Sequence, residues 1–359
     1  MPHPAGLTRR GALGTALALA APGIGRAAPS ASITFFTLPT YTDPKLVGDF
    51  TKQTGIELKT QAAADTDPMV AKLMATRGEG FDVVSLSNQL VPQFVREGLI
   101  EPLDVSRLKY WNDLYPSFTT APFIDIGKHG LVAGIPMVWG YDGLIYRTDK
   151  ISEADSWSAL WDPRYKGRIG TVDFGYQNVL IAAQVLGMND TLKKSPIDFS
   201  DDQLTQIKAK LIAQKALLNK YWASTAEGGT LLASGEIWIS LGRLAMVQLL
   251  KDEGVNAKLL SPKEGAQGWS NVCAILKASQ NKDAAYAFLD YMSGPSFQGP
   301  LTAVKGYPGV NKPVMEAQPQ ALKDKLLLGN PDLAKSLVWW GISKDPRRIN
   351  NLWNEVKAA

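Results

Sequence analysis

The 359-residue sequence contains few of the residues that build metal sites and covalent cross-links. Its single cysteine, Cys273, excludes an internal disulfide, and two histidines leave little for a zinc site. The sequence has no Walker phosphate loop, no GxGxxG following a strand, no HExxH and no GxSxG. Beyond position 30 no uncharged apolar run approaches the roughly 18 residues of a membrane span. We therefore expect neither a resident metal nor a bound cofactor.

An excess of basic charge is absent from most of the chain. The sequence has 38 Lys and Arg against 34 Asp and Glu, but Arg9, Arg10 and Arg26 lie in a leader without acidic residues. Without residues 1–27 the balance is 35 to 34, which gives no argument for a nucleic-acid partner. Hydrophobic residues make up 45% and charged residues 20%, as is typical of globular proteins, and the length predicts about two domains.

Residues 1–27 have the pattern of an export signal. The basic pair Arg9-Arg10 precedes an apolar stretch over 11–24, and small residues near position 27 provide a cleavage site. Thr8-Arg9-Arg10 resembles the twin-arginine export motif but lacks its later Phe and Lys, so ordinary Sec export is the alternative. No cysteine is present there for a lipid anchor. The sequence predicts a soluble protein of the bacterial periplasm.

Strand and helix patterns alternate along the remaining chain, which predicts an α/β fold with largely parallel sheets. Gly55 and Gly98 are typical helix stops. We expect strands over 32–37, 56–60, 81–86, 168–172 and 237–241, and helices over 44–55, 67–77, 89–97, 176–186, 202–218, 229–233 and 243–252.

Two long extended segments break this alternation, at 131–148 and 269–277. They bracket an inserted α/β block, so the chain before and after the block must pack together. Two lobes joined by two extended crossings form a hinged clamshell with a ligand cleft between them. We expect one lobe from residues 28–138 plus 272–305, a second from 139–271, and a C-terminal helical segment, 306–359, packing on the lobes.

Several motifs resemble the spermidine/putrescine-binding group of periplasmic solute-binding proteins, which serve ABC importers. The resemblance covers nearly the whole mature chain, and its most specific part is the segment SWSALWDPRYKG at 156–167. It also rests on FTKQTGI at 50–56, FDVV at 81–84, REGLI at 96–100, IPMVWG at 135–140 and SPKEG at 261–265. It implies the type II periplasmic-binding fold, with two α/β lobes, two hinge strands and a ligand held between them.

Carried over position by position, the family's polyamine pocket changes character in this sequence. The family places aromatic walls and carboxylates around the ligand, and three carboxylate positions fall on Phe174, Gln177 and Asn271. Aromatic wall positions become Leu38, Gln89 and Ser240, while Tyr41 and Ser87 are kept. Trp139, Trp269 and Tyr307 complete the predicted pocket, with the two tryptophans as candidates for stacking on a ligand.

The loss of carboxylates decides the expected ligand class. Removing one partner of a buried ion pair costs about 3–5 kcal/mol, so three losses oppose tight binding of a dication. Asp142 and Asp173 could still hold one amine between them. Arg243, predicted at the start of a helix on the cleft side, suits a carboxylate or phosphonate, although an interlobe salt bridge explains it equally well.

We therefore expect a monomeric transport receptor that captures a small anionic or zwitterionic solute by hinge closure and delivers it to a separate membrane permease. Polyamine binding through a rearranged pocket is the alternative. A remote alternative is an enzyme on the same fold with Cys273 as nucleophile, although no histidine stands near it in the sequence.

Overall fold

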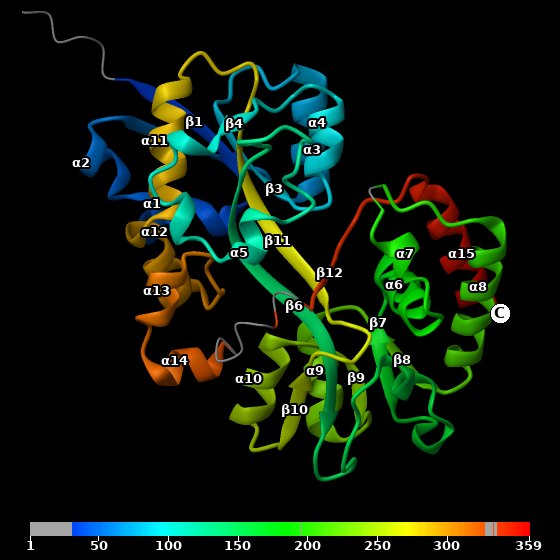
Figure 1. Cartoon of the computed structure of the whole chain (residues 1–359). Helices are drawn as coiled ribbons and strands as arrows, with labels where there is room; N and C mark the ends of the chain where they lie inside the picture. The colour runs from blue at the N-terminus through cyan, green and yellow to red at the C-terminus, as the bar shows by residue number, and fades with distance from the viewer. Residues whose placement is uncertain (1–30, 195, 327–332, 334–335) are drawn as a thin grey trace, which may run out of the picture. The chain divides into compact units, whose positions relative to one another are not determined.

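A long mixed β-sheet runs through the computed structural model, which describes residues 31–194, 196–326, 333 and 336–359. The predicted export signal at 1–27 lies outside the described residues. The sheet has the strand order β2-β1-β3-β11-β6-β9-β7-β8, with β10 paired to β6 and β12 to β11 (Figure 1). Strands β4 and β5 form a separate pair. The bounds are β1 (Ser32–Thr37), β2 (Glu57–Ala62), β3 (Val83–Ser87), β4 (Leu103–Asp104), β5 (Leu131–Val132), β6 (Ile135–Arg147), β7 (Ile169–Val172), β8 (Leu218–Trp222), β9 (Ile239–Arg243), β10 (Ala257–Leu260), β11 (Gln267–Ile275) and β12 (Val338–Trp339).

Helices connect most of these strands. The α-helices are α1 (Pro44–Val47), α2 (Phe50–Thr54), α3 (Thr66–Thr76), α4 (Val91–Arg96), α5 (Pro116–Thr119), α6 (Gly175–Val185), α7 (Asn189–Leu192), α8 (Asp201–Lys215), α9 (Thr225–Ser234), α10 (Leu244–Asp252), α11 (Lys282–Ser293), α12 (Pro295–Pro300), α13 (Lys312–Glu316), α14 (Gln320–Lys325) and α15 (Pro346–Ala358). Short 3-10 helices are η1 (Pro39–Thr42), η2 (Val105–Arg107), η3 (Trp111–Asp113), η4 (Trp157–Trp161) and η5 (Pro163–Tyr165), and η6 (Leu301–Lys305) is a π-helical turn.

The pairing directions divide the sheet into two parallel groups joined by antiparallel strands. Strand β1 is parallel to β2 and β3, and β7 is parallel to β8 and β9. Between the groups, β11 is antiparallel to β3 and β6, and β6 is antiparallel to β9. The predicted two-lobe α/β fold is confirmed, and the two long extended segments foreseen near 131–148 and 269–277 are β6 and β11, side by side in Figure 1.

Each lobe has its own hydrophobic core. The first core draws on residues 33–138 and 272–301, with Phe35, Phe50 and Phe288 in edge-to-face contact at its centre. The second core draws on residues 144–250 and includes the fully buried Trp157 and Trp222. A further cluster joins α6 and α8 to the C-terminal helix α15. The predicted lobe boundaries, 28–138 plus 272–305 and 139–271, stay a prediction.

Some elements differ from the sequence-based expectation. The single helix predicted over 44–55 is two helices, α1 and α2, which a turn at Gly48 and Asp49 separates. The helix predicted over 202–218 ends at Lys215, and strand β8 follows it. The aromatic residue that ends β8, Trp222, is fully buried and favours a strand.

The C-terminal segment, 306–359, contains a strand as well as helices. Strand β12 lies parallel to β11, and the Trp340 N–H donates to the Gly268 carbonyl at 2.9 Å. A side chain at Gly268 would come within 2.9 Å of Leu337 and Trp339, so glycine permits this close approach. The chain then enters α15, which packs on α6 and α8 of the second lobe.

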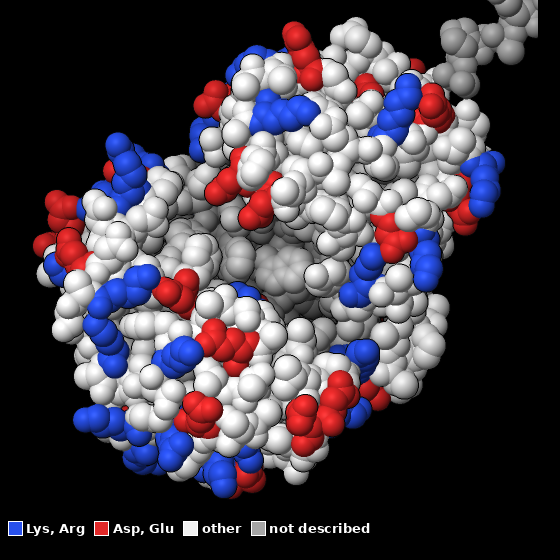
Figure 2. All heavy atoms as spheres, turned by 180° about the vertical axis from the view of Figure 1, so that it is seen from behind, with Lys and Arg blue, Asp and Glu red and all other residues white. Residues whose placement is uncertain are grey.

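The described residues show neither a membrane span nor a metal cluster. None of the helices in the described ranges is both long and apolar enough to cross a membrane. Within the same ranges, no three His, Cys, Asp or Glu side chains are grouped so as to hold a metal ion. Figure 2 shows one hollowed face of the molecule, with charges of both signs interspersed around it.

Candidate functional site

A cavity of about 670 Å³, here the main cavity, lies where the middle of β6 and the ends of β3, β9 and β11 approach the C-terminal segment. Its volume falls in the range of about 300–1,000 Å³ that holds small molecules. Elements of both lobes contribute to its wall. It is lined by Ser87, Trp139, Gly140, Tyr141, Asp142, Thr225, Arg243, Leu244, Ala245, Gln248, Trp269, Lys305, Gly306, Tyr307, Pro308, Lys325, Leu326 and Trp340.

Strand register brings Asp142 and Arg243 together. The two residues are directly opposite in the antiparallel pair β6–β9, so their side chains share one face of the sheet. Arg243 is the last residue of β9 and has an extended backbone, and α10 begins at the next residue. The sequence predicted this strand-to-helix junction, and the structure places its arginine in the cavity wall.

The Arg243 guanidinium is held by neutral groups and one carboxylate. Its Nε lies 3.4 Å from Asp142, Nη1 donates to Thr225 Oγ1 at 3.0 Å, and Nη2 donates to Gln177 Oε1 at 3.3 Å. The guanidinium also lies 5.4 Å from the Trp222 ring centroid. Three of its five N–H groups thus have partners among the described residues, and the side chain keeps 29% exposure toward the cavity. We call Asp142, Gln177, Thr225 and Arg243 the Arg243 cluster.

Asp142 is almost inaccessible, with a side-chain exposure of 3%. Burial raises the pKa of its carboxyl, and the positive charge of Arg243 opposes this rise. The fully buried Gln177 links the pair, since its amide nitrogen donates to Asp142 and its amide oxygen accepts from Arg243. Asp142 therefore anchors Arg243 from below, and the guanidinium is the part that reaches the cavity.

Four predicted residues lie together at the end of β3. Asn271 is opposite Ser87 in the β3–β11 register, and its amide nitrogen donates to the Tyr41 hydroxyl at 2.6 Å. The Ser87 hydroxyl donates to Gln89 Oε1 at 3.3 Å. Ser87 lines the main cavity, whereas Tyr41 is buried and Leu38 packs on the first core.

Asp173 and Phe174 are two of the eight predicted residues that do not line the main cavity. Asp173 accepts hydrogen bonds from Trp353 Nε1 and Lys357 Nζ, each at 3.1 Å, so it ties the start of α6 to the C-terminal helix. Asp173 and Asp142 therefore have different partners, and no contact among the described residues joins them. Phe174 is 44% exposed, with its ring 6.2 Å from Tyr176.

The remaining predicted residues divide between core and cavity. Ser240 is fully buried, and its hydroxyl accepts from Trp222 Nε1 at 3.0 Å, which holds the indole that underlies Arg243. Trp139 lines the cavity but is 6% exposed, and its Nε1 donates to the Gly309 carbonyl at 3.0 Å. Trp269 and Tyr307 line the cavity as an edge-to-face pair with centroids 5.9 Å apart.

Sequence reasoning missed several cavity residues. Lys305 and Lys325 reach the wall from the region after the first core, and Lys305 also pairs with Asp43 at 2.6 Å. Trp340 arrives through β12, the strand that the helical expectation for 306–359 left out. Among these missed residues, only Tyr141 had a sequence signal, because it directly precedes the predicted residue Asp142. Among the described lining residues, three cations face one carboxylate, Asp142.

A second cavity of about 510 Å³ lies on the other side of the β12 segment, and Trp340 lines both. Its wall includes Gln89, Lys193, Glu264 and Trp339. The Arg243 cluster does not contribute to it, so the charged chemistry foreseen from the sequence belongs to the main cavity.

Cys273 is fully buried in β11, with its sulfur 3.4 Å from the Met137 sulfur. Burial raises the pKa of its thiol far above neutrality, so the thiol stays protonated. Neither cavity includes it among its lining residues. This environment opposes a role as a nucleophile.

With this geometry established, comparison with known proteins identifies the family. The model of the bacterial extracellular solute-binding protein family matches residues 45–327. The chain belongs to this family. This solute-binding protein is 26% identical over 340 residues to the spermidine/putrescine-binding periplasmic protein 1 of Haemophilus influenzae, covering 93% of this chain and 91% of the relative. It is also 26% identical to the spermidine/putrescine-binding periplasmic protein of Escherichia coli, covering 85% of each chain.

Solved structures show the same fold. The spermidine/putrescine substrate-binding protein PotD from Streptococcus pneumoniae matches this solute-binding protein with a TM-score of 0.74 at 23% identity, over 92% of this chain and 99% of that one. The likeness confirms the two-lobe architecture expected from the sequence. Membership of a solute-binding family also agrees with the expectation of a transport receptor rather than an enzyme.

Proposed function

We propose that this chain is the periplasmic substrate-binding component of an ABC importer and that it carries a small organic anion or zwitterion in the main cavity. The names of its relatives, which are spermidine/putrescine-binding periplasmic proteins, support the transport role. The proposal includes export through the signal at residues 1–27 by the twin-arginine route, action as a monomer, and delivery to a separate membrane permease. The double substitution Arg9→Lys with Arg10→Lys should then block export, whereas continued export of this variant would favour the Sec route.

The observation that carries the ligand class is the environment of Arg243. Its guanidinium faces the cavity with N–H groups to spare, and charge-assisted hydrogen bonds to a carboxylate or phosphonate would use them. Lys325 adds positive charge to the same wall, whereas the charge of Lys305 is balanced by Asp43 at 2.6 Å. This surplus favours an anionic group on the ligand.

Polyamine binding is the second candidate, because the relatives bear that name. A dication needs desolvated carboxylates in reach of both ammonium groups. The described lining residues offer Asp142 alone, and Arg243 already occupies it. Asp173 is committed to Trp353 and Lys357. The charge balance therefore ranks this candidate below an acid.

Hinge closure provides the mechanism. The cavity takes Trp269 and Tyr307 from the side of the first core and Thr225 and Arg243 from the second lobe. A ligand that contacts both sides stabilises the arrangement in which both are close, so binding shifts the population toward that arrangement. The permease then distinguishes loaded from empty receptor by this difference in shape.

The test is a binding screen of the mature protein against polyamines, amino acids, dicarboxylates, phosphonates and aromatic acids. A ligand at 100 times its Kd adds about 2.7 kcal/mol to the free energy of unfolding, which a thermal-shift assay detects. Titration calorimetry then compares Arg243→Ala with a control variant, Arg147→Ala. Arg147 pairs with Asp149 in the same lobe, and neither residue lines the main cavity.

We expect Arg243→Ala to weaken binding of the identified acid about 100-fold or more, and Arg147→Ala to leave it unchanged. Binding of putrescine or spermidine that survives Arg243→Ala would overturn the anion site. An acid whose affinity is unaffected by Arg243→Ala would do the same.

A further inference from the structure

We infer that the ligand of the main cavity is an aromatic acid whose ring packs on Trp340 while its anionic group binds Arg243. This inference rests on the proposed function, since it takes the Arg243 anion site as given. It starts from the composition of the wall. Five aromatic side chains line the same cavity as Arg243, namely Trp139, Tyr141, Trp269, Tyr307 and Trp340.

The rings on the first-core side are fixed in place. One face of Trp269 covers Gly140, where a Cβ atom would lie 2.3 Å from the indole ring. Its edge relation to Tyr307 has an interplanar angle of 86°. Trp139 is held in a separate apolar cluster against Phe118, with centroids 5.6 Å apart. These rings form a rigid apolar surface that needs no rearrangement to receive a flat group.

The backbone of Trp340 is held from both lobes. Its N–H donates to Gly268 at 2.9 Å, and its carbonyl accepts from Asn88 Nδ2 at 2.7 Å. The next carbonyl, that of Gly341, accepts from the hydroxyl of Tyr176 in α6. Asn88 follows β3 of the first lobe, whereas α6 belongs to the second. The indole is therefore presented to the cavity by a positioned backbone.

The indole N–H of Trp340 lacks a partner. Its Nε1 is buried and makes no hydrogen bond to any described residue. A buried donor left unpaired costs free energy, and the indole nitrogen can only donate. Because the nitrogen is enclosed in this arrangement, an acceptor on the ligand, such as a ring hydroxyl or a second carboxylate, would pair with it only after the indole turns toward the cavity.

The charge of the lining residues decides whether these aromatic walls suit a cationic or an anionic ligand. Aromatic surfaces also receive ammonium groups, but the described wall carries Arg243 and Lys325 against Asp142, and Asp43 balances the charge of Lys305. That balance disfavours a cationic head group. A flat anion uses both features at once, since its charge meets the guanidinium and its ring meets Trp269, Tyr307 and Trp340 in stacked or edge-to-face contact.

The experiment is titration calorimetry of the mature protein with benzoate and 4-hydroxybenzoate against cyclohexanecarboxylate, which has the same charge and similar size but no aromatic ring. We expect the aromatic acids to bind about three- to tenfold more tightly for each ring contact that they make. Trp340→Leu should reduce this preference, whereas Trp238→Leu, at a half-buried position that does not line the main cavity, should preserve it.

Trp340→Phe separates the ring from its donor. This variant should retain the preference for benzoate over cyclohexanecarboxylate but lose the advantage of 4-hydroxybenzoate over benzoate. It also provides a test of the ring contact if Trp340→Leu fails to fold. Equal affinity for benzoate and cyclohexanecarboxylate would overturn the inference. Arg243-dependent binding of aliphatic acids alone would overturn it while leaving the proposed function intact. Polyamine binding that survives Arg243→Ala would overturn both.

Discussion

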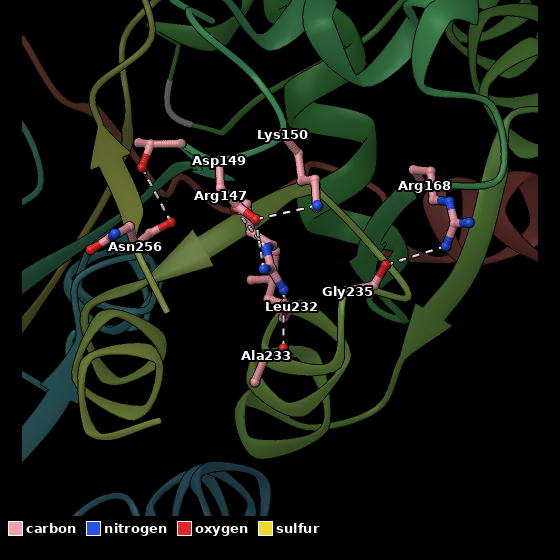
Figure 3. A network of polar contacts seen from close by, with 9 residues as sticks. Arg147, Asp149, Lys150, Arg168, Leu232, Ala233, Gly235 and Asn256 are labelled. Atoms are coloured by element: carbon pink, nitrogen blue, oxygen red, sulfur yellow. Dashed lines mark hydrogen bonds and ion pairs between the residues drawn. The ribbon is translucent and has the colours of Figure 1, made fainter. Parts of the chain in front are cut away.

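Two arginine–aspartate pairs flank the same helix, α9, and they differ in every respect that matters for binding. Arg147 makes a bidentate contact with Asp149, at 2.9 Å for both bonds, and its Nη1 donates to the Leu232 and Ala233 carbonyls at 3.0 Å (Figure 3). It thereby caps the C-terminal end of α9. At the other end of α9, Arg243 meets Thr225 and reaches Asp142 only at 3.4 Å.

The pKa values of the two carboxylates, Asp149 and Asp142, shift in opposite directions. Hydrogen bonds from Arg147 lower the pKa of the exposed Asp149 to about 2. Burial raises the pKa of Asp142 despite its arginine. Four of the five Arg147 donors are used within the protein, against three for Arg243, two of those at 3.3 Å or more. A guanidinium that uses most of its donors within the protein stabilises the fold, whereas one with spare donors beside a cavity is available to a ligand.

Removal of Arg147 gives the largest expected change in stability. Arg147→Ala removes one donor from each of two helix carbonyls and the bidentate contact of Asp149, and we expect a loss of about 2 kcal/mol in the free energy of unfolding. Chemical denaturation measures it, and calorimetry should show ligand affinity unchanged. A loss of affinity without a loss of stability would erase the proposed distinction between the two pairs.

Neutralising Asp142 tests the pair that lines the cavity. Asp142→Asn removes the carboxylate that competes for Arg243, so we expect affinity for the identified acid to rise about three- to tenfold. Because burial raises the pKa of Asp142, its charged form is costly in the folded state, and the substitution should destabilise the protein little. Titration calorimetry measures the affinity.

The opposite result would also be informative. A marked fall in affinity after Asp142→Asn would mean that this carboxylate contacts a positive group of the ligand, as in a zwitterion or polyamine. Asp149→Asn is the matched control, since Asp149 does not line the main cavity, and it should not change affinity.

Asp149→Asn itself should give the smallest effect, a change in how the free energy of unfolding depends on pH. The folded-state pKa of Asp149 is about 2, below its ordinary value of 3.8, so the pair stabilises the protein above about pH 4 and this contribution disappears as the pH falls toward 2. We expect wild type to exceed the variant by about 0.5–1 kcal/mol at neutral pH. Denaturation at about pH 6 and about pH 3 should show the difference shrinking; a constant difference would contradict this account.

Local patterns were sufficient for most of the fold. The strand predicted over 32–37 is β1 without change, and the extended run that ends near 148 is β6. The junction before Arg243 was visible because an apolar strand is followed directly by an amphipathic helix. Strands β8 and β10 were missed because they are short and follow helices closely, where periodicity carries little information.

The cavity was harder to foresee because distant segments complete it. Asp173 follows a strand that ends near the cleft, but Trp353 and Lys357, some 180 residues later, take its carboxylate. Trp340 enters the wall only because a two-residue strand pairs with β11. Neither partnership has a local sequence signature. The resemblance to polyamine-binding proteins supplied the positions near β3, and the fold supplied the rest.

The buried state of Cys273 has a practical consequence. It is the only cysteine in the sequence and has no accessible surface. A cysteine introduced on the exterior would therefore be the sole site for a thiol-reactive dye under native conditions. A dye at the cavity-lining position Gln248 would lie beside the proposed ligand site, and its emission would report on binding. The receptor is thus suited for conversion into a fluorescent sensor of the solute that it carries.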